Sequence, residues 1–256
     1  MGLTKSQINR LGEKLRHQPT IDAAGLNELQ ALRSLYDAPM AQVQTLLKER
    51  LGLDATSRLK TVNTILEKLS REKMRLAEMQ DIAGLRIVEN MGLGPQSHMV
   101  ERIAGLFPGA RIVDRRERPN RGYRAVHVVP EVDGYLIEIQ VRTTLQDLWA
   151  QSMERLADEA GREVRYGAIP VGWAVAIESF LSLSDSLRQF EEYIESIRIE
   201  RSQLPPPRDV SYGQRELQLY RARLDARLKS LESGVSELSD EIRDSLRELV
   251  EKKPKT

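Results

Sequence analysis

A row of cationic and hydroxyl side chains follows a helix that we predict from about Ser57 to Met79. The residues that follow Arg58 recur every three or four positions and therefore share one side of a helix. The set is Arg58, Lys60, Thr64, Lys68 and Arg71. Three long cations and a hydroxyl in a row can bind a polyphosphate through charge-assisted hydrogen bonds. Arg58, at the mouth of the row, could stack its planar guanidinium on a base. A solvated helix face is the alternative, because Lys and Arg at helical spacing are common.

Two acidic residues are candidate metal ligands. Asp81 directly precedes Ile82–Val88, an apolar stretch that we predict to be a buried strand. Glu138 lies in the predicted strand Tyr135–Arg142, where it shares a face with Gln140 and Arg142. Mg²⁺ is bound by one or two carboxylates together with phosphate oxygens, and Glu138 could also accept a proton from an attacking hydroxyl. The alternatives are that Asp81 is only a cap or turn residue, and that Glu138 lies on the solvent-exposed face of an ordinary amphipathic strand.

Arginine is concentrated between residues 111 and 124. The members are Arg111, Arg115, Arg116, Arg118, Arg121 and Arg124. So many neighbouring cations favour an anionic ligand. Tyr123 offers a flat ring on which a base can stack. His127 lies four residues further along the predicted strand Tyr123–Pro130, so it shares the face of Tyr123 and could contact phosphate or sugar. Core and edge positions of a strand are the alternative for both residues.

The pattern around these residues predicts an α+β fold, in which helices flank a mixed, partly antiparallel β-sheet. Helical periodicity runs from about residue 26 to 52 with an interruption near Pro39, and again from Thr144 to Ala160. Another helix ends at Pro108-Gly109. A fourth strand is predicted at Ala110–Val113, and Asp133-Gly134 predicts a hairpin turn before Tyr135.

The C-terminal part is predicted to be a helical extension. Helical sequence covers about residues 171–202, prolines break the chain at Pro205–Pro207, and a long helix follows from about Gly213 to Lys252. Its apolar residues are Leu217, Tyr220, Leu224, Leu228, Leu231, Val235, Leu238, Ile242, Leu246 and Leu249. Their spacing by threes and fours suits a partner helix, either in another chain or in the core of this one.

Composition narrows the class of protein. The 256 residues are 30% charged and 40% hydrophobic, and the formal net charge is +1, so basic sites must be local. The absence of cysteine excludes a disulfide scaffold, a thiolate zinc site and a cysteine nucleophile. The sequence shows neither an apolar signal-peptide core nor an apolar run of membrane-spanning length. We expect a cytoplasmic protein without a membrane partner.

Four ordered sequence blocks between about Ser57 and Asp158 resemble the RelA/SpoT-type alarmone synthetases, in particular their small single-domain members. The blocks are Arg58-x-Lys60-x₃-Thr64-Ile65-x₂-Lys68-Leu69-x-Arg71, Asp81-Ile82-Ala83-Gly84-Leu85-Arg86, Gly122-Tyr123-Arg124-Ala125-Val126-His127, and Glu138-Ile139-Gln140-Val141-Arg142-Thr143, followed by Trp149-Ala150. The order and separation of the four blocks carry the resemblance.

The resemblance implies a nucleotidyltransferase-like fold and a role for each matched residue. Arg58 and Arg86 would sandwich the adenine of ATP, and its phosphates would be held by Lys60, Thr64, Lys68 and Arg71. Asp81 and Glu138 would bind Mg²⁺, with Glu138 also acting as the base. The acceptor nucleotide would be bound by Arg118, Arg121, Tyr123, His127 and Gln140, with Tyr123 stacked on its guanine.

The function that this resemblance implies is ATP-dependent transfer of pyrophosphate to the 3′-hydroxyl of GDP or GTP, which makes (p)ppGpp. The loop Asp114–Arg121 is shorter and richer in arginine than the lysine-bearing loop usual in small synthetases. A toxic relative that modifies the tRNA 3′ end or adenosine nucleotides therefore remains an alternative, as does an inactive nucleotide-binding regulator. The identity of a regulator or antitoxin stays open.

The predicted organisation is an N-terminal helical segment (1–56), a synthetase core (57–165) and a C-terminal helical extension (166–256). We expect a synthetase without hydrolase or regulatory domains. The extension would form a homo-oligomer or bind a helical partner.

Overall fold

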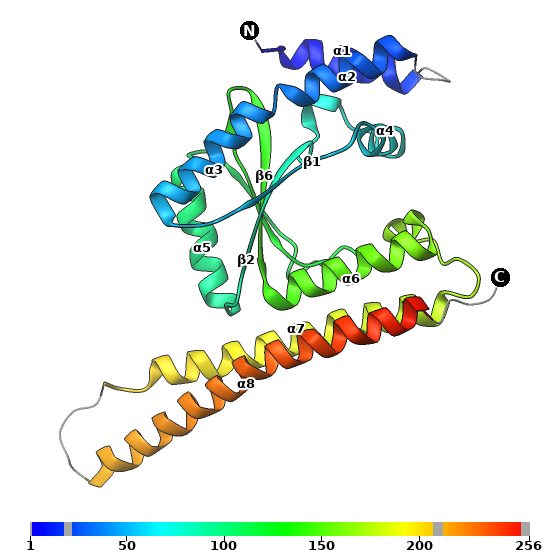
Figure 1. Cartoon of the computed structure of the whole chain (residues 1–256). Coiled ribbons are helices and arrows are strands. Elements are labelled where there is room, and N and C mark those ends of the chain that lie inside the picture. The colour runs from blue at the N-terminus through cyan, green and yellow to red at the C-terminus, as the bar shows by residue number, and fades with distance from the viewer. Residues whose placement is uncertain (1, 18–21, 207–211, 252–256) are drawn as a thin grey trace. The chain divides into compact units, whose positions relative to one another are not determined.

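The computed structural model describes residues 2–17, 22–206 and 212–251. The chain forms two compact units, each built from three separated stretches. The first, here called the sheet unit, comprises Met1–Val88, His98–Arg115 and Ala125–Arg142. The second, the helical unit, comprises Glu89–Ser97, Arg116–Arg124 and Thr143–Thr256. The predicted α+β class is confirmed, because a mixed β-sheet is flanked by helices (Figure 1).

The sheet has the strand order β1-β2-β6-β4-β3, with β5 paired to β6. The strands are β1 (Thr56–Leu59), β2 (Ala83–Glu89), β3 (Arg111–Asp114), β4 (Val126–Val129), β5 (Glu131–Val132) and β6 (Tyr135–Thr143). Side chains alternate between buried and half-buried along the first part of β2, whereas β6 is buried along most of its length. The predicted hairpin turn is confirmed: Asp133 and Gly134 have positive φ angles of 52° and 86°, as a tight two-residue turn requires.

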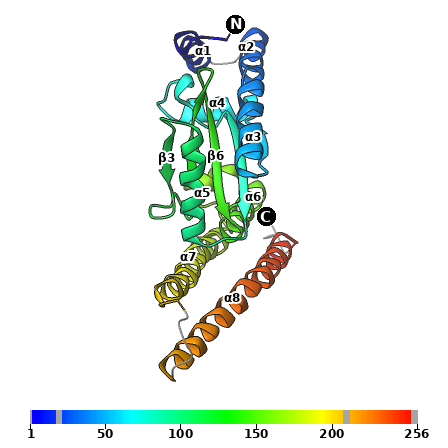
Figure 2. The same ribbon diagram turned by 90° about the vertical axis from the view of Figure 1, so that its left-hand side faces the viewer.

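The helical elements that accompany the sheet all precede strand β3 in the chain. They are α1 (Lys5–His17), α2 (Ala23–Ser34), α3 (Asp37–Leu51), α4 (Val62–Arg71), the 3₁₀ turn η1 (Leu76–Glu78) and α5 (Leu93–Leu106). Helix α1 packs against α2, α4 and η1, and α5 runs along one face of the sheet (Figure 2). The predicted interruption near Pro39 is confirmed, because α2 ends at Ser34 and Pro39 lies in the first turn of α3.

The helix predicted from Ser57 to Met79 is wrong at both ends. Thr56–Leu59 is a strand that pairs antiparallel with β2, so Arg58 is on a strand and lies opposite Gly84. The helix begins at Val62, because the side chain of Thr61 accepts a hydrogen bond from the backbone N–H of Thr64 and caps it. It ends at Arg71. Strand pairing with a distant segment overrides the helical spacing of the cations.

The strand predicted from Tyr123 to Pro130 begins only at Val126. Arg121 and Gly122 have positive φ angles of 51° and 81°, and the N–H of Tyr123 donates to the carbonyl of Asn120 at 3.1 Å. Residues 120–123 therefore form a tight turn, here called the Tyr123 turn. Because Tyr123 precedes the strand, the expectation that it shares a strand face with His127 is wrong.

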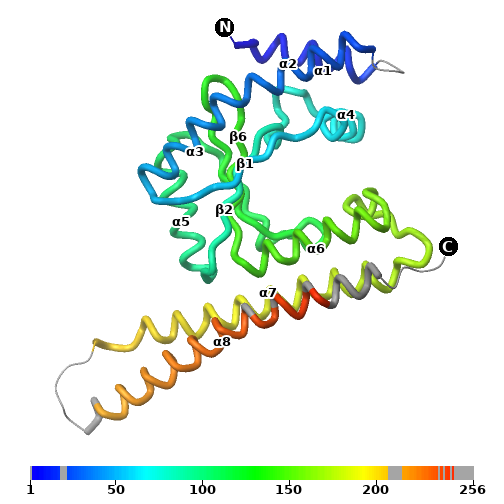
Figure 3. The backbone as a smooth tube through the Cα atoms, in the orientation of Figure 1, coloured from blue at the N-terminus to red at the C-terminus, as the bar shows by residue number. Residues whose placement is uncertain are grey.

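Three long helices build the helical unit: α6 (Thr144–Ala160), α7 (Ala174–Gln203) and α8 (Tyr212–Glu251). The 3₁₀ turn η2 (Arg162–Tyr166) follows α6. Each of the three helices packs against the other two, and α7 and α8 run side by side in opposite directions (Figure 3). Their core includes Trp149, Leu156 and Ile177.

The apolar row of α8 packs largely within this unit. Leu224, Val235 and Ile242 are buried, and Leu228, Leu231 and Leu238 are partly covered by the same core. Leu246 and Leu249 lie outside the part of the helix whose side chains are described, and Pro207 and Lys252 lie outside the described residues. Within the described ranges, no helix is both long and apolar enough to cross a bilayer.

Candidate functional site

Two lysines converge on Asp81 in the sheet unit. Lys60 Nζ lies 2.7 Å from Asp81 Oδ2, and Lys68 Nζ lies 3.0 Å from Asp81 Oδ1. All three side chains are about four-fifths buried, with exposed fractions of 19–23%. Burial alone would raise the pKa of Asp81, but the two lysines outweigh it and hold that pKa below its ordinary value. Asp81 is therefore ionised at neutral pH.

The N-terminal helices fix the backbone that carries these lysines. The N–H of Lys60 donates to the carbonyl of Ile82 at 2.8 Å, and Arg33 Nε of α2 donates to the carbonyl of Lys60 at 2.7 Å. Arg16 Nε of α1 donates at 3.3 Å to the carbonyl of Leu69, which lies in the last turn of α4. Segments outside the motif blocks thus determine where Lys60 and α4 lie.

Glu138 lies on β6 with both carboxylate oxygens engaged. Its Oε1 is 3.0 Å from His127 Nδ1, and its Oε2 accepts a 2.6 Å hydrogen bond from Gln140 Nε2. Antiparallel pairing of β4 with β6 sets His127 directly opposite Gln140, so Glu138, two residues before Gln140, is its diagonal neighbour on the same face of the sheet. Arg142 Nη2 donates to Gln140 Oε1 at 2.7 Å and orients that amide. Burial would raise the pKa of Glu138, but the bonds from His127 and Gln140 hold it below its ordinary value.

The two acidic residues are electrostatically coupled, because the charge of Asp81 raises the pKa of Glu138. Within the described residues, no group of three or more Asp, Glu, His or Cys side chains could hold a metal ion. A pair of ionised carboxylates still fits Mg²⁺, which takes its remaining ligands from phosphate and water. The donor set therefore agrees with the predicted magnesium ligands, which stay a prediction.

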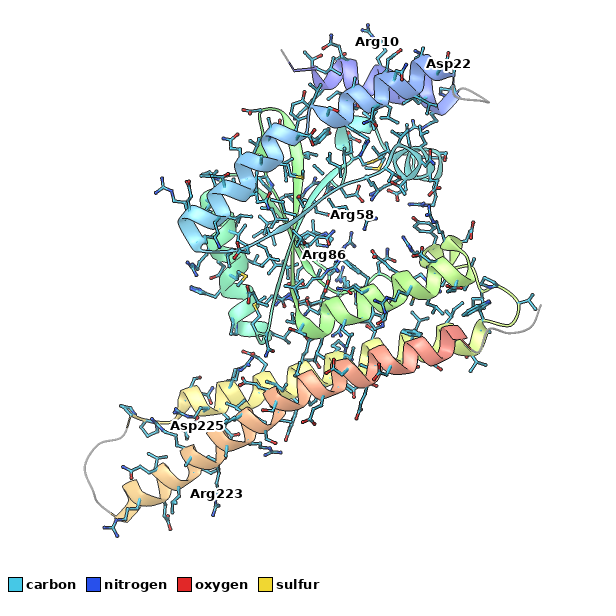
Figure 4. All side chains as sticks on the ribbon, in the orientation of Figure 1. Arg10, Asp22, Arg58, Arg86, Arg223 and Asp225 are labelled. Atoms are coloured by element: carbon cyan, nitrogen blue, oxygen red, sulfur yellow. The ribbon has the colours of Figure 1, made fainter. Side chains whose placement is uncertain are left out.

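Arg58 and Arg86 come together on neighbouring strands. Arg58 is paired with Gly84 and Thr56 with Arg86, so the two arginines are diagonal neighbours on one face of the sheet. Figure 4 shows them close together. Of the remaining predicted phosphate ligands, Thr64 lies in the first turn of α4 and its hydroxyl donates to the carbonyl of Thr61 at 2.9 Å. Arg71, the last residue of α4, is ion-paired with Glu72.

The Tyr123 turn lines a cavity of about 200 Å³ in the helical unit. The lining residues are Asn120, Arg121, Tyr123, Trp149, Ala150, Met153, Glu154, Val164 and Arg165. A β-carbon at Gly122 would lie 2.6 Å from Trp149 Cζ2, so only glycine fits there, and its φ of 81° favours glycine as well. The cavity combines aromatic walls with two arginines, a composition suited to a nucleobase and its phosphates. Arg118 is exposed and does not line it.

Sequence reasoning missed two residues next to this turn, Ser184 and Glu191 of α7. Ser184 Oγ donates to the carbonyl of Gly122 at 2.6 Å, and Glu191 Oε2 lies 3.3 Å from Arg124 Nη1. Neither belongs to a motif block. The available signal was their position, since both interrupt the apolar face of a helix.

Comparison with known proteins places residues 57–156 in the region found in RelA and SpoT proteins. Uncharacterized proteins of Mycobacterium bovis and Mycobacterium tuberculosis are 38% identical over 184 residues, which cover 68% of this chain and 66% of theirs. The small alarmone synthetase 1 of Bacillus subtilis shares 25% identity at a TM-score of 0.47, with 70% of this chain and 96% of that one covered. A GTP pyrophosphokinase family protein of Streptococcus pneumoniae shares 21% identity at a TM-score of 0.44, with 71% and 96% covered. Residues 57–156 of this chain therefore form the region found in RelA and SpoT proteins.

Proposed function

We propose that this protein is an ATP-dependent pyrophosphokinase that modifies the 3′-hydroxyl of GDP or GTP. The observation that carries the proposal is the arrangement in the sheet unit, where ionised Asp81 and Glu138 are coupled and two lysines converge on Asp81. Cations beside a potential metal ligand suit a polyphosphate, because phosphoryl transfer depends mainly on positioning and charge neutralisation. The family region supports the same class of reaction.

In the proposed reaction, the carboxylate of Glu138 accepts the proton of the 3′-hydroxyl. The 3′-oxygen then bonds to the β-phosphorus of ATP, the bond from that phosphorus to the α,β-bridging oxygen breaks, and AMP leaves with the bridging oxygen. Lys60 and Lys68 lie where they can exchange Asp81 for phosphate oxygens. Mg²⁺, held by Asp81 and Glu138, would neutralise charge on the phosphates. His127 and Gln140 hold the Glu138 carboxylate in place.

The cavity beside Tyr123 is the proposed site for the acceptor base. Its volume of about 200 Å³ and its aromatic lining suit a single planar ring system. Stacking a base on one aromatic side chain contributes on the order of 1–3 kcal/mol. We assign Tyr123 to this stacking role and Arg121 to the acceptor phosphates.

A second candidate function, pyrophosphorylation of the tRNA 3′ end, has one observation in its favour. Arg111, Arg115 and Arg118 are all exposed, and each could contact a nucleic-acid backbone. Binding through several phosphates would make activity fall steeply as salt rises. The net charge of only +1 favours the mononucleotide over tRNA.

The deciding experiment incubates the protein and Mg²⁺ with ATP labelled in its β- and γ-phosphates and, separately, GDP, GTP, AMP or deacylated tRNA. We expect label to enter GDP and GTP. The Glu138→Gln variant should lose at least about 100-fold in turnover while it still binds ATP, since general-base catalysis contributes roughly 10²–10⁴-fold. Glu131→Gln, an exposed acid on β5 of the same unit, is the matched control and should keep full activity.

Two outcomes would contradict the proposal. Labelled tRNA with unlabelled GDP and GTP would favour the second candidate. Near-wild-type turnover of the Glu138→Gln variant would remove Glu138 from the chemistry.

A further inference from the structure

Two polar residues interrupt the apolar face of α7. The buried residues of this helix recur every three or four positions and are Ile177, Phe180, Ser184, Leu187, Glu191, Ile194 and Ile197. Ser184 is 2% exposed and Glu191 is 5% exposed. Burying a hydroxyl or a carboxylate is unfavourable unless each finds a partner, so the partners of these two residues indicate their purpose.

Ser184 holds the peptide immediately before Tyr123. Its hydroxyl donates to the carbonyl of Gly122 at 2.6 Å, and its Cβ lies 3.0 Å from the position that a β-carbon of Gly122 would occupy. Gly122 is thereby confined between α7 and Trp149. Arg121, a residue with a side chain, has a φ of 51° in this turn. Such a conformation persists only where the surroundings enforce it.

Glu191 holds the residue immediately after Tyr123. Its carboxylate lies 3.3 Å from Arg124 Nη1 and accepts hydrogen bonds from the hydroxyl of Thr143 and, at 3.4 Å, from Gln146 Nε2. Arg124 is itself only 3% exposed. Because a buried ion pair contributes little net stability compared with apolar packing, this pair is better explained by the geometry that it imposes.

The same helix also fixes another wall of the cavity. Trp149 Nε1 donates to the backbone carbonyl of Phe180 at 2.8 Å. Trp149 and Tyr123 both line the cavity, so α7 determines the position of two of its aromatic walls. This helix begins at Ala174, after the end of the family region at residue 156.

We infer that Ser184 and Glu191 are positioning residues that fix the Tyr123 turn, so that binding of the acceptor depends on α7. The identity of the acceptor, a guanosine nucleotide, rests on the proposed function. The positioning itself rests on the contacts of Ser184 and Glu191. Helix α7 is then a part of the acceptor site rather than only an appended support.

The test compares Ser184→Ala with Ser186→Ala. The hydroxyl of Ser186 is exposed and donates only to the carbonyl of Ser182 in its own helix, so it is a matched control. We expect Ser184→Ala to raise the KM for GDP by roughly two- to tenfold, the factor carried by one ordinary hydrogen bond. The KM for ATP should not change. Amide hydrogen exchange of residues 120–124 in the free protein should become faster.

A second pair of variants tests the charge. Glu191→Gln removes the negative charge opposite Arg124 but keeps an acceptor for Thr143. Glu192→Gln removes an exposed charge that is paired with Arg188 on the same helix. We expect the first variant to raise the KM for GDP about tenfold or more, and the second to leave it unchanged. If Glu191→Gln does not fold, the smaller change at Ser184 decides the question.

Two results would overturn the inference. One is a Ser184→Ala variant whose KM for GDP and exchange rates at 120–124 equal those of Ser186→Ala. The other is a parallel rise of both KM values together with a lower melting temperature, which indicates general loosening. A wild-type protein that transfers nothing to GDP refutes the proposed function, and the exchange rates at 120–124 then still decide whether α7 positions the turn.

Discussion

Burial and neighbouring groups act against each other on the pKa of the two buried glutamates, and the outcome differs between them. Burial by itself raises the pKa of Glu138 and that of Glu191. In Glu138, the bonds from His127 and Gln140 prevail, and the pKa falls below its ordinary value. In Glu191, burial prevails over the hydrogen bond from Thr143 and the positive charge of Arg124, and the pKa lies above its ordinary value of 4.5.

The raised pKa of Glu191 predicts a pH dependence of stability. A carboxyl group that binds its proton more tightly in the folded state contributes stability below pH 4.5 and loses that contribution as pH rises through the folded-state pKa. The free energy of unfolding of the wild type, relative to that of Glu191→Gln, should therefore fall as pH rises above 4.5 through the folded-state pKa of Glu191. Urea unfolding at several pH values measures this difference. For Glu192→Gln, the plot of unfolding free energy against pH should stay parallel to that of the wild type. If the plot for Glu191→Gln is parallel as well, the raised pKa of Glu191 is contradicted.

The sequence was sufficient to select the charged residues of the candidate site, but it did not predict which of them contact one another. Asp81, Glu138, Lys60 and Lys68 could be selected from their spacing in the chain. The pairing of both lysines with Asp81 and of His127 with Glu138 could not, because each contact joins residues from different elements. The roles assigned to these residues stay predictions.

At the scale of elements, local signals located the helices and strands but not every boundary. The hairpin at Asp133-Gly134 and the break near Pro39 depend on turn chemistry and proline geometry, which act locally. The strand Thr56–Leu59 forms because β2 pairs with it, and a pairing between distant segments leaves no local signature. The cap residue Thr61 was the signal that could have placed the start of α4.

Helix α8 supplies a test of whether its apolar row serves this chain or another. Ile242→Ala should destabilise the protein by about 2–5 kcal/mol, because Ile242 is buried in the core of the helical unit. That loss corresponds to a melting temperature lower by roughly 4–20 °C. Leu219→Ala, at an exposed position of the same helix, should change it little. An unchanged melting temperature with a smaller mass in light scattering would instead assign the row to self-association.

At the scale of the whole molecule, the division into two units could not be foreseen from the sequence. The predicted organisation was three consecutive regions, whereas Glu89–Ser97 and Arg116–Arg124 pack with the C-terminal helices. Both stretches lie between strands of the sheet in the chain. Only long-range contacts, such as those of Arg124 with Glu191 and of Gln96 with Gln146, assign them to the helical unit.

The position of Trp149 gives the protein a built-in optical reporter. The chain has two tryptophans, Trp149 and Trp173, and only Trp149 lines the cavity beside Tyr123. Replacing Trp173 with Phe would leave Trp149 as the sole indole emitter. A guanine that enters the cavity should quench its fluorescence by contact, so titration with GDP should give a saturable signal without any turnover. The signal should need roughly ten- to hundredfold more GDP in Tyr123→Ala and should be unchanged in Glu138→Gln, which lets occupancy of the cavity be followed separately from chemistry.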